Sequence, residues 1–152
     1  MKKSKKEKNE DDFAPALVAA SRALVAAGMA ELVSCGFDSM TPALVSLMPL
    51  LDVRGVRPTA LAQQARITKQ AIGQLVRELE VRGYVEQVPD PTDTRAKIVR
   101  LTKRGVVLHA ACAKARRKLQ SVAIAKLGKS KVLRLQRDLM ELAVLLEKTR
   151  TR

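Results

Sequence analysis

The sequence predicts a mainly α-helical fold with one small β-hairpin. Three observations lead to this prediction. Apolar residues recur at helical spacing over most of the 152 residues, two short helical segments are separated by a brief turn, and two strand-like runs follow them directly. Trp is absent and aromatic residues make up only 2%, which argues against the stacking platforms that bind single-stranded nucleic acid.

The first two expected helices precede the hairpin. A helix is expected over residues 13–34, with Gly36 as its C-cap. Thr41 and Pro42 suit the N-cap and first turn of a second helix, which Pro49 should kink or shorten. The segment 1–12 is charged and low in hydrophobicity, so we expect it to be disordered.

Two further helices form the informative centre of the sequence. Pro58 opens a short helix that should end near Ala65, and Thr68 caps a second one that Gly83 ends. So short a turn between them predicts a helix-turn-helix. The apolar positions of the second helix follow the i, i+3, i+4, i+7 pattern and are Ile72, Leu75, Val76 and Leu79.

The expected hairpin has an unusually long loop. The strand-like runs lie at 84–88 and 97–101, which leaves the eight residues 89–96 between them. Hairpin loops commonly have two to five residues. A loop of this length should reach away from the protein body.

Two helices follow the hairpin. Thr102 should cap a long helix that ends near Leu127, and Ser130 should cap the last helix, through about Lys148. The last helix carries apolar residues at alternating spacings of three and four, which is a heptad seam able to pack within the monomer or against a second chain. The seam consists of Val132, Leu135, Leu139, Leu142 and Leu146.

The positive charge is concentrated at one end of the sequence. The net charge is +14, and residues 102–152 contain fourteen basic and three acidic residues, a net +11. A polyanion partner such as nucleic acid is the natural interpretation, with a solubilising surface as the alternative. Most of the basic residues of the last two helices are expected to be solvated.

A helix-turn-helix followed by a hairpin is a winged helix, and three motifs resemble the MarR-type transcriptional regulators. They are LEVRGYV at 79–85, the wing triplet DTR at 93–95 and LTKRG at 101–105. The resemblance implies a homodimer that binds double-stranded DNA, with residues 13–40 and 102–152 in dimerisation and 41–101 as the DNA-binding domain. It also implies release from DNA by a small phenolic or anionic effector held between these parts.

The second helix of the helix-turn-helix should present its unburied face to the major groove of DNA. That face is rich in hydrogen-bond donors, and Gly73 at its centre would permit close approach. Many members of the family carry Thr and Arg where this sequence has Gly73 and Gln74. A solvated helix face is the alternative. The candidate residues are Thr68, Lys69, Gln70, Gly73, Gln74 and Arg77.

The hairpin and the preceding helix offer further candidates. Arg95 suits the narrow minor groove, Lys97 lies nearby, and Asp93 is expected to hold the Arg95 guanidinium in a bidentate pair; a weak surface salt bridge is the alternative. Arg57 and Thr59, at the start of the first helix of the helix-turn-helix, are candidate phosphate contacts, or simply part of a helix cap.

Other sites are not expected. His109 is the only histidine, and we interpret it as structural or solvent-facing. No catalytic, cofactor or metal-binding motif is recognised, so the protein is not expected to be an enzyme. Arg22 and Glu31 argue against a membrane span in the first helix, and a cytoplasmic location is expected. Cys35 is expected to be buried and structural.

The function predicted from the sequence is a dimeric, sequence-specific regulator of transcription, expected to be a repressor. One alternative is a redox sensor that uses Cys35. Another is a non-specific architectural DNA-binding protein, and a protein adaptor that pairs through the leucine seam remains a further possibility.

Overall fold

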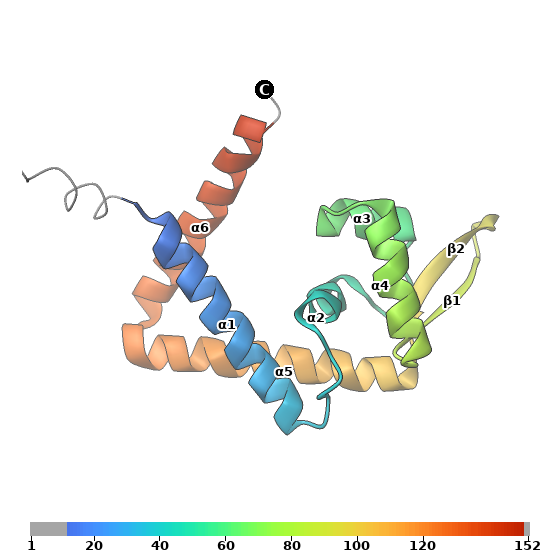
Figure 1. Cartoon of the computed structure of the whole chain (residues 1–152), viewed down its shortest axis with the longest axis horizontal. Coiled ribbons are helices and arrows are strands. Elements are labelled where there is room, and N and C mark those ends of the chain that lie inside the picture. Colours follow the sequence, from blue (N-terminus) through green and yellow to red (C-terminus); the bar gives the residue numbers. More distant parts are fainter. Residues whose placement is uncertain (1–11, 151–152) are drawn as a thin grey trace, which may run out of the picture. The chain divides into compact units, whose positions relative to one another are not determined.

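The structure is a computed structural model that describes residues 12–150 (Figure 1). It confirms a mainly helical fold with one hairpin. The segment expected to be disordered lies outside the described residues apart from Asp12. The elements in order are α1 (Ala14–Ser34), α2 (Pro42–Leu47), the 3-10 helix η2 (Met48–Leu50), α3 (Pro58–Ala65), α4 (Lys69–Val81), β1 (Val85–Asp90), β2 (Asp93–Leu101), α5 (Lys103–Leu127) and α6 (Lys129–Arg150).

The contacts divide the chain into two compact units, one ending at Ala115 and one beginning at Arg116. The first unit contains α1 through β2 and the first half of α5, and the second contains the rest of α5 and α6. The helix-turn-helix and hairpin therefore share a unit with the start of the long helix that follows them.

The helix boundaries follow the capping signals of the sequence. Thr41 and Thr68 are the N-caps of α2 and α4, and their hydroxyl oxygens accept the N–H groups of Leu44 and Ala71 at 3.3 and 3.1 Å. The effect of Pro49 is confirmed, because α2 ends at Leu47 and continues only as η2.

The core of the first unit joins α2, α3, α4, the hairpin and α5. Leu44, Leu61, Ile72 and Leu79 are all 0% exposed. The expected apolar face of α4 is confirmed, with Val76 also buried and Leu75 packed at the edge of the core. The burial of this face orients the opposite face of α4 to solvent.

The hairpin is an antiparallel pair that a third segment extends. In the register, Val85 lies opposite Leu101 and Pro89 opposite Lys97. Val56 forms a bridge with Val99, with two backbone hydrogen bonds of 2.9 Å. The segment just before α3 is thereby attached to the sheet, and α3 and α4 pack beside it (Figure 1).

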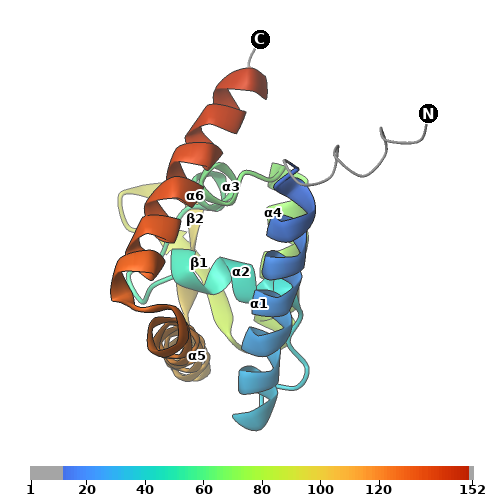
Figure 2. The ribbon, with the colours of Figure 1, turned by 90° about the vertical axis from the view of Figure 1, so that its left-hand side faces the viewer.

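The turn between α5 and α6 differs from the sequence prediction. Gly128 has a φ of 84°, and the chain changes direction there (Figure 2). Helix α6 begins at Lys129, and the N–H of Val132 donates to the carbonyl of Gly128 at 3.2 Å. Ser130 therefore lies inside the first turn, and the prediction that it caps α6 was wrong. A glycine that can adopt positive φ reverses the chain without a separate capping residue.

Large apolar side chains are exposed along α1. Leu24 is 61% exposed and Val33 is 51% exposed. Among the described residues, α1 is the one helix long and apolar enough to cross a membrane by length and composition, with 6% of its most apolar window buried. The prediction that Arg22 and Glu31 exclude it on this criterion was therefore wrong, because the alanine-rich remainder outweighs them in the average.

Three of the five residues of the expected seam of α6, Leu135, Leu139 and Leu146, are exposed too, and Val132 and Leu142 are half-buried. Leu135 is 51% and Leu146 52% exposed, and Met140 outside the seam is 64% exposed. Contiguous exposed apolar surface is uncommon on monomeric soluble proteins and marks an interaction surface.

Candidate nucleic-acid interface

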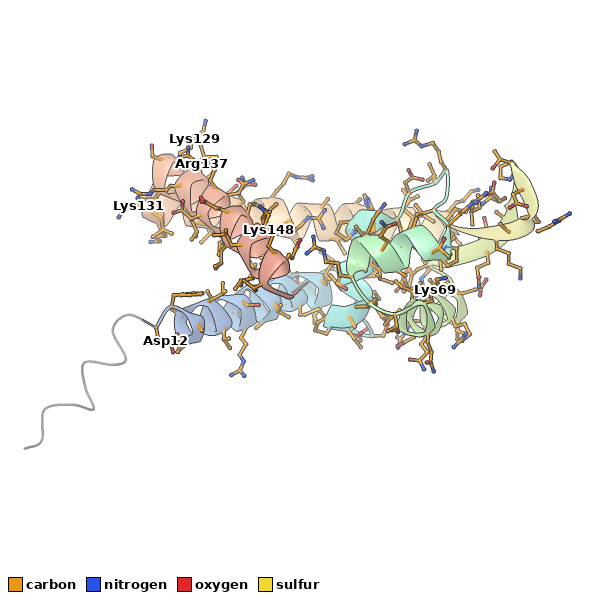
Figure 3. All side chains as sticks on the ribbon, turned by 90° about the horizontal axis from the view of Figure 1, so that it is seen from above. Asp12, Lys69, Lys129, Lys131, Arg137 and Lys148 are labelled. Atoms are coloured by element: carbon orange, nitrogen blue, oxygen red, sulfur yellow. The ribbon has the colours of Figure 1, made fainter. Side chains whose placement is uncertain are left out.

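Helix α4 presents a solvent-facing surface rich in hydrogen-bond donors. Gly73 is half-buried in this surface, and Thr68 lies exposed at its N-cap. Amide and guanidinium groups on an exposed helix can reach base edges in a major groove, where each base pair has a distinct donor and acceptor pattern. The exposed side chains of this surface are Lys69, Gln70, Gln74 and Arg77 (Lys69 is labelled in Figure 3).

Gly73 has room for a side chain within the protein. A Cβ built on Gly73 would meet only Nη1 of Arg77, at 3.5 Å, which is an ordinary van der Waals distance. The fold itself therefore does not require glycine here. Glycine in a helix interior costs about 0.5–1 kcal/mol relative to alanine, so the close approach of a ligand remains a reason for its presence.

Gly73→Ala should separate folding from ligand binding. We expect the free energy of unfolding to rise by about 0.5–1 kcal/mol, since alanine is the better helix former. We expect affinity for target DNA to fall, because the added methyl group would lie on the surface that approaches the bases. Urea denaturation and a DNA titration by fluorescence anisotropy measure the two effects. Unchanged affinity in a stabilised variant would show that no close approach occurs at this position.

The hairpin turn is shorter than the sequence predicted. The ladder continues to Asp90 on β1 and resumes at Asp93, so the turn consists of Pro91 and Thr92. The predicted eight-residue loop was wrong because the prolines were interpreted as strand ends. Pro89 lies in β1, which pairs only with β2 in the described part of the chain, and proline is tolerated on such an edge strand.

The extra residues between the two regularly paired parts of the hairpin form an irregularity in β2. The register shifts between Pro89 and Asp90, so residues 94–96 have no partner in β1. Bulges of this kind bend a strand and redirect its side chains. Arg95 lies in this bulge, and Arg95 and Lys97 are both exposed.

Asp93 does not hold the guanidinium of Arg95. Its Oδ1 accepts the backbone N–H of Arg95 at 3.2 Å, and its Oδ2 lies 3.9 Å from Nη2 of Arg57. The predicted bidentate pair was therefore wrong. A carboxylate two residues before an N–H readily closes a local turn with the backbone instead. Asp93 still orders the wing, but it leaves the Arg95 guanidinium available.

Asp90 is the central polar residue of the turn, and the sequence prediction did not include it. It is 5% exposed, and its Oδ1 accepts both the N–H and the hydroxyl of Thr92, at 2.8 and 2.7 Å. Its Oδ2 accepts Nε of Arg57 at 2.6 Å. The Asp-Pro-Thr sequence was an available signal, because an aspartate two residues before a threonine favours such a turn.

These bonds favour the ionised form of Asp90. The hydroxyl of Thr92 contributes most, followed by the Thr92 N–H and then Arg57, and together they lower the pKa of Asp90 from 3.8 to about 2. The carboxylate of Asp90 is therefore negatively charged at neutral pH and pairs with the positively charged guanidinium of Arg57.

Acid unfolding should depend on Asp90. Because the pKa of Asp90 is lowered in the folded chain, its contribution to stability is present above pH 3.8 and is lost as the pH falls through about 2. We expect Asp90→Asn to reduce the steepness with which the free energy of unfolding falls over this interval. Urea titrations at a series of acidic pH values measure the slope, and an identical slope in the variant would contradict this assignment.

Thr59 and Arg57, the two candidate phosphate contacts at the start of α3, have different surroundings. Thr59 is exposed in the first turn, where backbone N–H groups are free of helical partners. Arg57 instead directs Nε to Asp90, with its side chain 45% exposed. Of the two, only Thr59 has no competing partner among the contacts of the described residues.

The two cysteines have opposite environments. Cys35 is exposed at the C-cap of α1, so the prediction that it is buried was wrong, whereas Cys112 is buried in α5. Cys35 follows a helix, α1, most of whose described residues are exposed. His109 is half-buried, and within residues 12–150 no group of three or more His, Cys, Asp or Glu could hold a metal ion.

The basic residues of the second unit whose side chains the structure describes lie on the surface. Lys129, Lys131 and Arg137 are exposed and point outward from α6 (Figure 3). Arg134 forms a 3.7 Å pair with Asp138 in which both side chains are largely exposed. Such pairs contribute little to stability, so this surface remains strongly positive.

Comparisons with known proteins agree with the motifs and the fold. Residues 47–96, from the end of α2 to the wing, match the MarR family. An uncharacterized helix-turn-helix-type transcriptional regulator of Mycobacterium bovis is 29% identical over 99 residues, which are 64% of this chain and 69% of the relative.

Two solved structures share the fold. FabT of Streptococcus pneumoniae, in complex with DNA, has a TM-score of 0.77 at 18% identity, covering 88% of this chain and 94% of FabT. The MepR–DNA complex of S. aureus has a TM-score of 0.75 at 17% identity, covering 89% and 98%. The matched segment, the sequence relative and the six-helix fold with its wing agree with one another: residues 47–96 are similar to the MarR family, and the chain has the winged helix-turn-helix fold of these two structures.

Proposed function

We propose that the protein is a homodimeric, sequence-specific regulator that binds double-stranded DNA and acts as a repressor. The observation that carries the proposal is the exposed donor surface of α4, which lies opposite the buried face of that helix. The match of residues 47–96 to the MarR family supports it, as do the similar folds of FabT and MepR, each solved with DNA. No catalytic step or cofactor is part of the proposal.

In the proposed complex, α4 enters the major groove. Lys69, Gln70, Gln74 and Arg77 would face base edges or phosphates, and Gly73 would permit close contact. The wing would place Arg95 in the neighbouring minor groove with Lys97 close to the backbone. Thr68, Thr59 and Arg57 would lie near phosphates at the N-terminal ends of α4 and α3.

The proposed partner for the exposed apolar surfaces is a second copy of the chain. Helices α1 and α6 both expose many large apolar side chains, and α6 repeats them at heptad spacing. A homodimer would bury both surfaces and place two α4 helices on a roughly palindromic site, about one helical turn of DNA apart. A regulator of this kind acts on chromosomal DNA in the cytoplasm.

Regulation by a small ligand is the remaining part of the proposal. By family resemblance, a phenolic or anionic effector would bind between the helix-turn-helix and the dimerisation helices. It would lower DNA affinity by favouring a dimer with a different spacing of the two α4 helices. A panel of phenols and aromatic carboxylates tests this part, since an effector should raise the melting temperature and release DNA. Compounds that stabilise the protein without releasing DNA would contradict this mechanism.

Selection of binding sites from random DNA tests the main proposal. We expect enrichment of one inverted-repeat site, and we expect Arg95→Ala to weaken binding to it by about 1–3 kcal/mol. Arg95→Lys should recover only part of the loss, because the planar fork of arginine is absent. Arg54→Ala removes an exposed arginine outside α4 and the wing, and it should bind as the unmodified protein does.

The same experiment separates the proposal from non-specific DNA binding. The strongly positive residues 102–152 would support binding to any sequence, with steep salt dependence and little preference. Equal competition by scrambled DNA at fixed salt would therefore favour an architectural role. A protein adaptor that pairs through the leucine seam should retain its function in Arg95→Ala.

Redox sensing through Cys35 is a second candidate because its side chain is exposed. Peroxide can reach an exposed thiol but not a buried one. If Cys35 is the sensor, peroxide should release DNA from the unmodified protein but not from Cys35→Ser. Equal release from both proteins would exclude this role.

A further inference from the structure

We propose that Arg57 and Asp90 form a positioning pair that fixes the wing, so that Arg57 acts on DNA binding through the placement of Arg95. The inference rests on the proposed function and changes the role of Arg57 within it. Arg57 would be a positioning residue first and a phosphate contact at most second. The argument combines the backbone around Arg57, the burial of Asp90 and the irregular register of β2.

The backbone on both sides of Arg57 is held in place. Val56, immediately before it, exchanges two 2.9 Å hydrogen bonds with Val99 in the middle of β2. Pro58, immediately after it, begins α3, and the Arg57 carbonyl accepts the N–H of Leu61 at 3.0 Å. Arg57 is therefore a fixed connection between the sheet and the helix-turn-helix, and its side chain starts from a defined point.

Asp90 is the hydrogen-bond acceptor of the pair. Its carboxylate is 5% exposed and accepts three hydrogen bonds, one from Nε of Arg57 at 2.6 Å and two from Thr92. A nearly buried carboxylate with three donors is unlike a solvated surface pair, whose contribution to stability is small. The bonds to Thr92 also make Asp90 part of the turn itself, so that fixing Asp90 fixes the tip.

The position of Arg95 depends on this tip and not on strand pairing. Residues 94–96 lack partners in β1, and regular pairing resumes only at Lys97. On the tip side, Asp93 Oδ1 accepts the N–H of Arg95, and Asp93 Oδ2 lies 3.9 Å from Nη2 of Arg57. The guanidinium of Arg57 thus lies near Asp90 at the end of β1 and near Asp93 at the start of β2. The bulge that carries Arg95 follows Asp93 directly.

The benefit of such a support is pre-organisation. Fixing the backbone of one residue costs about 1–2 kcal/mol of conformational entropy. If the unpaired residues of the wing were ordered only on contact with DNA, that cost would be subtracted from the binding free energy. If the wing is already ordered in the free protein, the loss of conformational entropy occurs during folding and does not reduce the binding free energy.

Direct contact of Arg57 with a phosphate leads to the opposite expectation for Asp90. If Asp90 only occupied Arg57, its removal would free the guanidinium, and DNA affinity would stay equal or increase. If Asp90 positions the wing, its removal should weaken binding. Asp90→Asn distinguishes the two, because the asparagine keeps the size of the side chain and an oxygen for Thr92 but loses the charge that holds Arg57.

The experiment is a double-mutant cycle on the selected DNA site. We expect Asp90→Asn and Arg57→Gln each to weaken binding about tenfold, by analogy with the loss of one specific arginine contact. We expect Arg95→Ala to lose most of its own effect in the Asp90→Asn background, because a misplaced Arg95 contributes little. Asp52→Asn is the matched control, since Asp52 also accepts backbone N–H groups and pairs with an arginine, at 3.4 Å, but lies outside the wing.

Amide hydrogen exchange of the free protein provides a readout independent of DNA. The N–H groups of Thr92 and Arg95 should exchange faster in Asp90→Asn and Arg57→Gln, and at the unmodified rate in Asp52→Asn. Unchanged exchange, full affinity, or additive losses with Arg95→Ala would each overturn the inference. Absence of site-selective binding by the unmodified protein would overturn the proposed function instead, while hydrogen exchange would still test the pair.

Discussion

Gly105→Ala is expected to destabilise the folded protein by about 3 kcal/mol or more, the range of severe overpacking. A Cβ built on Gly105 would lie 1.9 Å from the carbonyl oxygen of Tyr84 and 2.9 Å from its carbonyl carbon. These are backbone atoms, so no rotation of a side chain can relieve the overlap. The first turn of α5 would have to move away from Tyr84, which lies between α4 and β1.

Three contacts would resist that movement. The Thr102 N–H donates to the Tyr84 carbonyl at 3.1 Å, and the Thr102 hydroxyl donates to the Gly83 carbonyl at 2.7 Å. The guanidinium of Arg104 lies over the Tyr84 ring, 4.8 Å from its centroid. Two of the motifs that suggested the family are therefore parts of one junction, in which glycine is required by close packing.

Urea denaturation at a fixed protein concentration measures the effect. We expect a lower midpoint with an unchanged slope, since the surface exposed on unfolding is the same. Gly73→Ala is the matched control, because the same substitution in α4 has space and should raise the midpoint. Equal midpoints for the two variants would contradict the interpretation of Gly105.

Leu135→Asp combined with Leu139→Asp should dissociate the proposed dimer. About half of each leucine is already covered in the isolated chain, so burial of the rest by a partner contributes about 0.7–1.5 kcal/mol per leucine, and the dissociation constant should rise by about 10–10²-fold or more. The two side chains are 51% and 39% exposed in the isolated chain. The fold of each chain should therefore persist while association is lost. DNA affinity should fall with it, because a monomer reaches only one half-site.

Analytical ultracentrifugation over a range of protein concentrations measures the association. Arg137→Asp is the control, since two residues along a helix place Arg137 nearly opposite Leu139. It changes the net charge by two units, as the double leucine variant does, so a purely electrostatic effect would appear equally in both. A double variant that remains dimeric would place the interface elsewhere, and dissociation of Arg137→Asp alone would indicate a different face of α6.

The local features that the sequence predicted were those set by near neighbours. Thr41 and Thr68 cap the helices expected of them, because a capping bond spans only three residues. The buried face of α4 follows from helical period and hydrophobicity. The exposed face follows as its complement, so Lys69, Gln70, Gln74 and Arg77 could be named without a structure.

The wing was predicted less accurately because its geometry depends on distant partners. Arg57 and Asp90 are 33 residues apart, and nothing local indicates that they meet. Pro89 and Pro91 indicated a loop, whereas the ladder continues past Pro89. The exposure of Cys35 was likewise missed, since burial depends on what packs against the end of α1.

The sequence by itself therefore determined the helix-turn-helix, its donor-rich surface, the existence of a wing and the resemblance to the MarR family. Helical period, capping chemistry and charge act over a few residues, and they can be interpreted without tertiary contacts. Only the tertiary structure decided the two-residue turn, the bulge that carries Arg95, the Arg57–Asp90 pair and the need for glycine at position 105. Each of these results from backbone or side-chain atoms that are distant in sequence and lie within a few ångströms only after the chain has folded.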